Sequence, residues 1–121
     1  MKDSDRAISY LLAIEENLEL ASQLATSDLH EFTSDPFRVL AAEALFIRCG
    51  ELAKRLARLY PEHFSSASWR MLAQHRDKVA HDYLALDHDM LYLTLQQDLP
   101  ALRGELGRGK EFLKEVRNSS R

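Results

Sequence analysis

The apolar positions of this chain recur with the spacing of α-helices, and no stretch alternates with the two-residue period of a strand. The first repeat forms a continuous apolar stripe over about residues 5–25 and is broken at residues 26–28. Its members are Ala7, Leu11, Ile14, Leu18, Ala21 and Ala25. Because such a stripe needs a partner helix to cover it, the pattern predicts a helical bundle.

A longer second helix is predicted from about residue 36 to Tyr60. Ser34-Asp35-Pro36 supplies a capping side chain and then a proline where the missing N–H costs nothing. Pro61 ends the helix because it disfavours the α conformation for the residue before it. The side chains expected to face the core are Phe37, Leu40, Ala44, Ile47, Leu52, Leu56 and Leu59.

Two more helical patterns follow a serine-rich connector. The first runs from Trp69 to about Tyr83 and is expected to bury Leu72, Val79 and Trp69 itself. Asp87 is expected to cap the second. The apolar residues of the second pattern are Met90, Leu91, Leu95 and Leu99, and the same period resumes at Leu102, Leu106 and Leu113.

Pro100 lies inside this last pattern and is expected to kink or divide the helix. Three glycines weaken the helical pattern beyond it, so residues 107–121 are expected to be a basic tail that can fray. The sequence thus predicts an all-α, up-and-down bundle of four to five helices, with one domain spanning residues 1–121.

The composition supports a single soluble domain. Of 121 residues, 45% are hydrophobic and 29% charged, and no apolar run approaches the length of a membrane span. The charged N-terminus does not resemble a signal peptide and the single Cys49 cannot form an internal disulfide, so a cytoplasmic location is expected. The net charge of −3 argues against a protein that coats nucleic acid indiscriminately.

The segment from Arg76 to Tyr83 places a permanent cation, an imidazole and a phenol on about two helical turns. Asp77 and His81 are four residues apart and share a face, so Asp77 could accept a hydrogen bond from the imidazole and fix its tautomer. Arg76 could bind phosphate oxygens. The alternative is structural: Arg76 pairs with an acid, His81 is half-buried, and Tyr83 packs its ring.

With these residues placed, the chain resembles the HepT-like branch of the HEPN superfamily, small all-helical proteins many of which are ribonucleases of toxin–antitoxin or defence systems. The family signature is an arginine, a polar residue, three further residues, a histidine, one residue and a tyrosine. Arg76, Asp77, His81 and Tyr83 fill these positions in order. Three other stretches also resemble the family: AAEALFIRCGELAKRL from Ala41 to Leu56, Ser68-Trp69 with Leu72, and Asp98-Leu99-Pro100. The resemblance thus extends from about Phe37 to Leu106.

The resemblance implies a homodimer in which the motif helices of two subunits form one composite cleft. It also implies a metal-independent endoribonuclease in which a ribose 2′-OH attacks the adjacent phosphate. His81 would act as general base or acid, Arg76 would stabilise the phosphorane, and Asp77 would orient one or the other.

The resemblance further implies a nucleotidyltransferase antitoxin, as in HepT and MntA pairs. This antitoxin would transfer AMP to the tyrosine of the motif, here Tyr83, and so silence the toxin. The added phosphate and base would repel and block RNA. Lys54 and Lys78, together with Arg55 and Arg58, are candidates for RNA-phosphate contacts, with an ordinary solvated face as the alternative.

Three other interpretations compete with this one. A non-catalytic dimeric module could bind a nucleotidyltransferase or a nucleotide through Arg76 and Tyr83. A metal site is disfavoured because the histidines at positions 63, 75, 81 and 88 are 12, 6 and 7 residues apart, whereas ligands on one helix are usually three or four apart. No metal or other cofactor is therefore expected. His75 and His88 are expected to be exposed. Cys49 lies on a helix predicted to be packed and is expected to be a core thiol.

Overall fold

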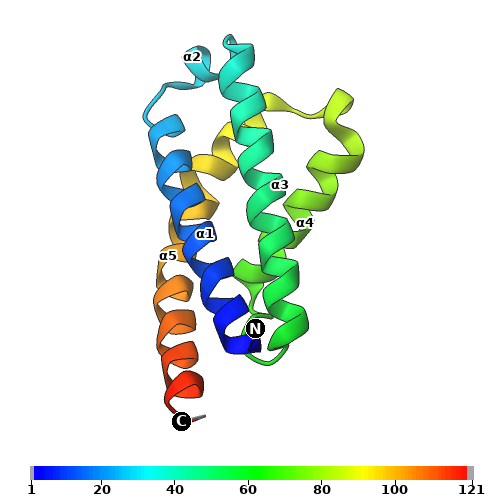
Figure 1. Ribbon diagram of the computed structural model, residues 1–121. Helices are drawn as coiled ribbons and strands as arrows, with labels where there is room; N and C mark the ends of the chain where they lie inside the picture. Colours follow the sequence, from blue (N-terminus) through cyan, green and yellow to red (C-terminus); the bar gives the residue numbers. More distant parts are fainter. Residues whose placement is uncertain (1, 120–121) are drawn as a thin grey trace.

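The computed structural model describes residues 2–119 and contains no strand within them. The all-α prediction is confirmed (Figure 1). The elements, in chain order, are α1 (Asp3–Leu24), α2 (Leu29–Thr33), α3 (Pro36–Leu59), α4 (Ala67–Asp82), the 3₁₀ turn η1 (Tyr83–Ala85) and α5 (His88–Ser119). None of these helices is long and apolar enough to cross a membrane.

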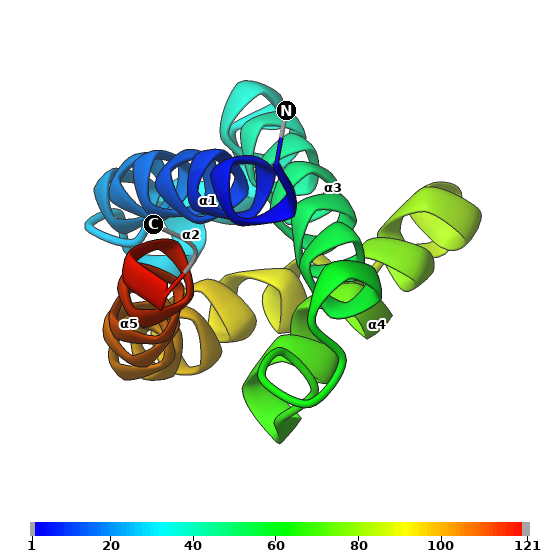
Figure 2. The same ribbon diagram turned by 60° about the horizontal axis from the view of Figure 1, so that its bottom comes forward.

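Helix α1 packs along α3 on one side and α5 on the other, as both views of the ribbon show (Figures 1 and 2). Its predicted stripe is confirmed as the buried face except at Ala25, which is half-buried just beyond the end of the helix. The residues of α1 in the core are Ala7, Leu11, Ile14, Leu18 and Ala21.

The short helix α2 was not predicted, although its signal is present in the sequence. Asp28 Oδ1 accepts a hydrogen bond from the backbone N–H of Glu31 at 2.8 Å, and Glu31 Oε1 accepts one from the N–H of Asp28 at 3.3 Å. This reciprocal capping box fixes the first turn. It delivers Phe32 into the core, where its ring meets Tyr92 at a centroid distance of 5.5 Å.

Helix α3 begins and ends close to the predicted positions, because the Asp35 side chain accepts from the N–H of Phe37 at 3.0 Å and Pro61 follows the last turn. Its predicted inner face is wrong in its first half: Phe37 is 82% exposed and Leu40 60% exposed. The core-facing residues are Val39, Ala42, Leu45, Phe46, Cys49, Ala53 and Leu56. Helix α3 therefore carries two apolar faces, and Phe37, Leu40 and Ala44 form an outer stripe that is exposed.

Helix α4 buries Trp69, Leu72 and Val79 as predicted. In α5, Asp87 Oδ1 accepts from the N–H groups of Asp89 and Met90, which confirms the predicted cap. The remaining members of the core from α5 are Leu91, Leu95, Leu99, Leu102, Leu106 and Leu113.

Pro100 lies inside α5. The first part of that helix runs at an angle to the rest (Figure 1), which is the predicted kink. Helix α5 continues through the basic tail to Ser119, with Leu113 fully buried, while residues 120 and 121 lie outside the described part. The fraying of this tail in solution stays a prediction.

Candidate active site

The motif is held against α3 by an unusually close helix contact at Gly50. A Cβ atom built on Gly50 would lie 2.1 Å from Arg76 Cβ and 2.6 Å from the carbonyl oxygen of Leu72. No side chain larger than hydrogen fits there, because real Cβ contacts below 3.0 Å are essentially absent. Gly50 therefore sets the distance between α3 and α4 and lets the Arg76 stem lie directly on the α3 backbone.

Carboxylates on two helices hold the guanidinium group of Arg76. Its Nε lies 3.4 Å from Glu51 Oε2 on α3, and its Nη1 lies 3.2 Å from Asp77 Oδ1 on α4. Nε is buried and makes no hydrogen bond, so the contact with Glu51 is an ion pair without hydrogen-bond geometry. The side chain retains 28% of its exposure, which leaves part of the guanidinium open to an anionic ligand.

Asp77 joins the two helices. Lys54 Nζ, from α3, donates to Asp77 Oδ1, the same oxygen that faces Arg76. The hydrogen bond from Lys54, reinforced by both positive charges, lowers the pKa of Asp77 below its ordinary value. Glu51 and Asp77 thus face three cations, since Arg55 Nε also lies 3.9 Å from Glu51, and the cluster keeps a net positive charge.

The expected hydrogen bond between Asp77 and His81 is not formed among the described residues. The reason is competition: Lys54 and Arg76 both donate to Asp77, and hydrogen bonds from charged donors to a carboxylate are strong. Asp77 is consequently placed to orient Arg76. Asp77 was expected to orient either His81 or Arg76, and the geometry favours Arg76.

His81 and Tyr83 occupy the exposed end of the motif. His81 lies in the last turn of α4 and is solvent-exposed, so its imidazole is accessible to a substrate. Helix α4 ends at Asp82, where the backbone leaves the helical region with φ −121° and ψ 26°. Tyr83 therefore belongs to the η1 turn, 59% exposed, and does not continue the stripe of Arg76 as it would on an ideal helix.

Lys78 lies on another side of α4 from this cluster. At 100° per residue it is rotated by about 200° from Arg76. Its positive charge instead acts on His75, whose pKa is lowered chiefly by burial and to a lesser degree by Lys78. The structure thus places Lys54 in the cluster and Lys78 outside it.

Two of the histidines considered as metal ligands contact other side chains. His63 stacks on Phe112 with 3.6 Å between ring centroids. His75 is half-buried, in contrast to the predicted exposure, with its Nε2 3.8 Å from Asp98 Oδ2 and its ring against Phe46; His88 is exposed as expected. Within residues 2–119, no group of three His, Cys, Asp or Glu side chains could hold a metal ion.

Cys49 is a core residue, as predicted. It is 1% exposed, and burial raises the pKa of its thiol to about 12. A thiol that stays protonated at neutral pH is a poor nucleophile, so Cys49 is not part of the chemistry.

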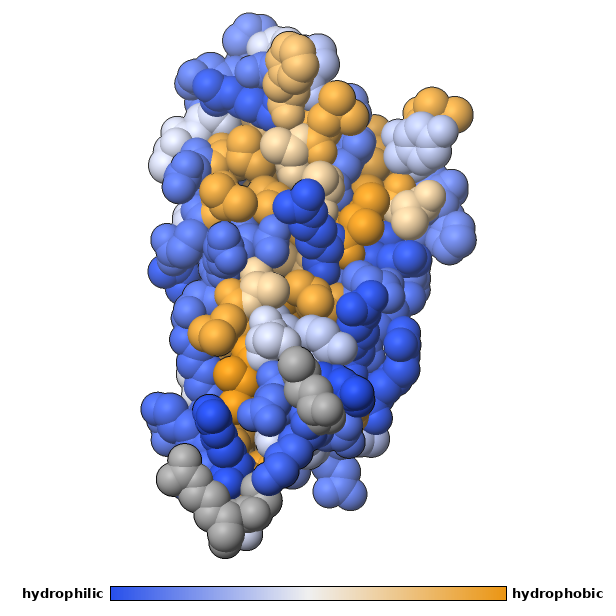
Figure 3. All heavy atoms as spheres, in the orientation of Figure 1, coloured by the Kyte–Doolittle hydropathy of each residue, from blue (hydrophilic) through white to orange (hydrophobic). Residues whose placement is uncertain are grey.

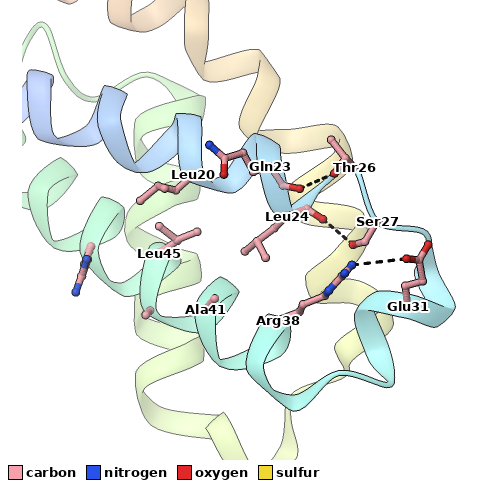
Figure 4. Close-up of a pocket in the computed structure, with 11 residues that line it drawn as sticks. Leu20, Gln23, Leu24, Thr26, Ser27, Glu31, Arg38, Ala41 and Leu45 are labelled. Carbon is pink, nitrogen blue, oxygen red and sulfur yellow. Dashed lines mark hydrogen bonds and ion pairs between the residues drawn. The ribbon is translucent and has the colours of Figure 1, made fainter.

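A hollow of about 590 Å³ lies elsewhere, between the end of α1 and the first half of α3 (Figure 4). Leu20, Leu24 and Leu45 line it, and Arg38 at its edge already pairs with Glu31 at 3.9 Å. Its serine and threonine hydroxyls are hydrogen-bonded to turn carbonyls. Its lining includes no histidine that could move a proton, so its size does not make it the reaction site.

Sequence reasoning did not assign roles to Glu51 and Gly50, although both were noted as part of the resemblance. The signal was the Gly50-Glu51 pair one turn before Lys54. A single sequence does not show which residues of two distant helices face each other, so the pairing with Arg76 and Asp77 required the structure.

Comparisons with known proteins agree with this geometry. A family model described as "Ribonuclease HepT-like" matches residues 14–108. A Thermococcus cleftensis protein named "Probable ribonuclease HepT" is 32% identical over 101 residues, covering 79% of this chain and 88% of its own. A protein of Caldanaerobacter subterraneus subsp. tengcongensis, named provisionally as an RNase, is 27% identical over 85 residues, covering 70% and 73%.

No solved structure matches the chain significantly. The family assignment therefore rests on the sequence matches, and the residues matched by the family model span the long helix α3 and the motif from Arg76 on α4 to Tyr83 on η1. By these matches, the chain belongs to the HepT-like ribonuclease family.

Proposed function

We propose that this protein is a metal-independent endoribonuclease toxin that works as a homodimer and is neutralised by a nucleotidyltransferase antitoxin. The observation that carries the proposal is the constrained Arg76 beside an exposed His81 on one short segment. A fixed guanidinium can stabilise the charge of a pentacovalent phosphorane, and an accessible imidazole can move a proton.

In the proposed reaction, the ribose 2′-oxygen forms a bond to the adjacent phosphorus and the bond from phosphorus to the 5′-oxygen breaks. One imidazole takes the proton of the 2′-OH, and a second proton is delivered to the leaving 5′-oxygen. Because each subunit's motif has one imidazole, His81, two subunits would supply both groups. Arg76, oriented by Glu51 and Asp77, would bind the non-bridging phosphate oxygens.

This function is tested by incubating the purified protein with RNA in excess chelator, in parallel with the same sequence carrying 2′-deoxyribose at the cut position. Cleavage of the RNA and complete resistance of the substituted strand are expected, because the attacking group is then missing. Cleavage of both strands, or cleavage only after a divalent metal is added, would contradict the proposed mechanism.

The outer stripe supports the homodimer. Its residues Leu40 and Ala44 share a face of α3 with Ile47 and Glu51 at successive steps of four, three and four, so the exposed apolar surface leads directly to the site. Leu84, just after the motif, is 90% exposed. Figure 3 shows hydrophobic atoms gathered over the upper halves of α1 and α3 and again at the upper end of α4.

We expect Leu40→Glu to convert the dimer into a folded monomer that no longer cleaves RNA. The substitution places a charge in the proposed interface, where it cannot be solvated, but Leu40 is 60% exposed in the subunit and contributes little to the core. Sedimentation gives the mass, and circular dichroism the helix content. Leu12→Glu is the matched control, because Leu12 is 52% exposed on α1. If both variants had the same mass in solution, the proposed interface at Leu40 would be excluded.

The proposed antitoxin is an MntA-like nucleotidyltransferase that transfers AMP to Tyr83. Tyr83 is 59% exposed on the η1 turn, which makes its phenol reachable by another enzyme, and each adenylyl group would add a negative phosphate and a bulky base to the exposed end of the motif.

Incubation with such a partner and ATP is expected to add mass in AMP units to the wild type and none to Tyr83→Phe. Intact-mass spectrometry measures the gain. Tyr10→Phe, which keeps the motif unchanged, should gain as much as the wild type. An equal gain in Tyr83→Phe would show that another residue is modified.

A further inference from the structure

A second hollow, of about 280 Å³, adjoins the site between the last turns of α3 and the first turns of α4. This is the end of the bundle turned toward the reader in Figure 2. Lys54 belongs to both places: it lines the hollow and donates to Asp77. The hollow is therefore continuous with the candidate active site.

Positive charge surrounds this hollow. Arg58, from α3, and Arg70, from α4, line it together with Lys54, and its lining includes no acidic residue. Among the described residues neither Arg58 nor Arg70 has an ion pair, whereas Arg38 at the larger hollow pairs with two carboxylates. Two guanidinium groups on facing helices, without counterions from the protein, are suited to bind an anion from outside.

The floor is apolar and smooth. Ala53, Ala57 and Ala73 present only methyl groups, and this is why a hollow exists between two helices that otherwise pack closely. Its volume is below the range of about 300–1,000 Å³ typical of enclosed ligand pockets, so it suits one unit of a longer polymer that lies on the surface.

We propose that this hollow is the subsite for the nucleotide that flanks the scissile phosphate of single-stranded RNA; this inference rests on the proposed ribonuclease function. Arg58 and Arg70 bind the phosphate of that nucleotide, and its ribose or base covers the alanine floor. Arg58 is four residues from Lys54, about 6 Å along the helix axis, so the strand continues from the site along the α3–α4 groove.

The test compares Arg58→Gln and Arg70→Gln with Arg48→Gln. Arg48 is a matched control, because it also lies exposed on α3 without an ion pair in the described part of the chain, but it lines the larger hollow. Each subsite variant is expected to raise KM for RNA about five- to tenfold with kcat within about twofold of the wild type, since phosphate contacts position the strand and do not take part in the chemistry.

Direct binding separates the subsite from catalysis. Binding of a fluorescein-labelled single-stranded oligoribonucleotide to the His81→Ala background is measured over a range of salt concentrations. Each subsite variant should reduce the slope of log affinity against log salt by about 0.7, the value for one lost phosphate contact on a single strand. Arg48→Gln should leave the slope unchanged.

The outcomes are distinguishable. If RNA is cut normally but both subsite variants behave like Arg48→Gln, the subsite is refuted and the ribonuclease stands. If the wild type cuts no RNA but binds the oligonucleotide through Arg58 and Arg70, the proposed function is refuted, and the hollow stands only as a binding site for single-stranded RNA. Absence of oligonucleotide binding, or equal weakening by all three variants, overturns the subsite.

Discussion

His81→Ala is expected to reduce the rate of RNA cleavage by a factor of about 10²–10⁴, the usual contribution of a general acid or base. His81 is exposed and supports no hydrogen bond or ion pair among the described residues, so its removal leaves the fold intact. The loss should appear in kcat with little change in KM, because the imidazole acts on the reacting proton and does not bind the strand.

Initial rates are measured by gel over a range of RNA concentrations with the chelator present, which gives kcat and KM separately. His30→Ala is the matched control: it removes another exposed histidine from α2, which packs on α3 and α5 and not on α4. A loss smaller than about tenfold in His81→Ala, or a similar loss in His30→Ala, would exclude the proposed role of His81.

Gly50→Ala is expected to have the largest effect on stability, lowering the free energy of unfolding by about 3 kcal/mol or more. The new methyl group would stand 2.1 Å from Arg76 Cβ and 2.6 Å from a backbone carbonyl of α4, so the two helices must separate. The rate of RNA cleavage should fall in the same variant, because Arg76 would move away from Glu51 and lose their ion pair. Chemical denaturation measures the first effect and the RNA assay the second.

Gly107→Ala is the matched control for this change. No atom lies within 4 Å of the position its Cβ would occupy, so the substitution should stabilise helix α5 by about 0.5–1 kcal/mol through helix propensity alone. If both glycine variants were equally stable, the contact at Gly50 would not determine the packing of α3 on α4.

The helices were predictable from the sequence because their boundaries depend on local chemistry. A capping side chain and a proline act on neighbouring backbone groups. The caps formed by Asp35 and Asp87 and the kink at Pro100 inside α5 are therefore as expected. The capping box of α2 was equally local and was overlooked.

The core face of α3 could not be predicted in the same way. Apolar side chains cover two faces of this helix, and periodicity does not show which face meets α1 and α4. A prediction from one chain also treats every apolar side chain as a candidate for its own core, so Phe37 and Leu40 were assigned inward. Both side chains are exposed instead, and the proposed homodimer would cover them.

The site was predicted in composition but not in its contacts. The residues of the motif were recognised from their order, yet spacing along one helix suggested that Asp77 would bond to His81. In the structure, Lys54, which lies 23 positions earlier in the chain, donates a hydrogen bond to the carboxylate of Asp77. Long-range ion pairs of this kind depend on how two helices cross, which in this protein is decided by the missing side chain of Gly50.

The chemical identity of the cut ends tests the central claim most directly, because the claim is that Arg76 and His81 promote attack by a ribose hydroxyl without a metal ion. RNA cleaved by the wild type in excess chelator is analysed by mass spectrometry. The account predicts a 2′,3′-cyclic phosphate on one fragment and a 5′-hydroxyl on the other. A 3′-hydroxyl paired with a 5′-phosphate would mean that water attacked the phosphorus, and would contradict it.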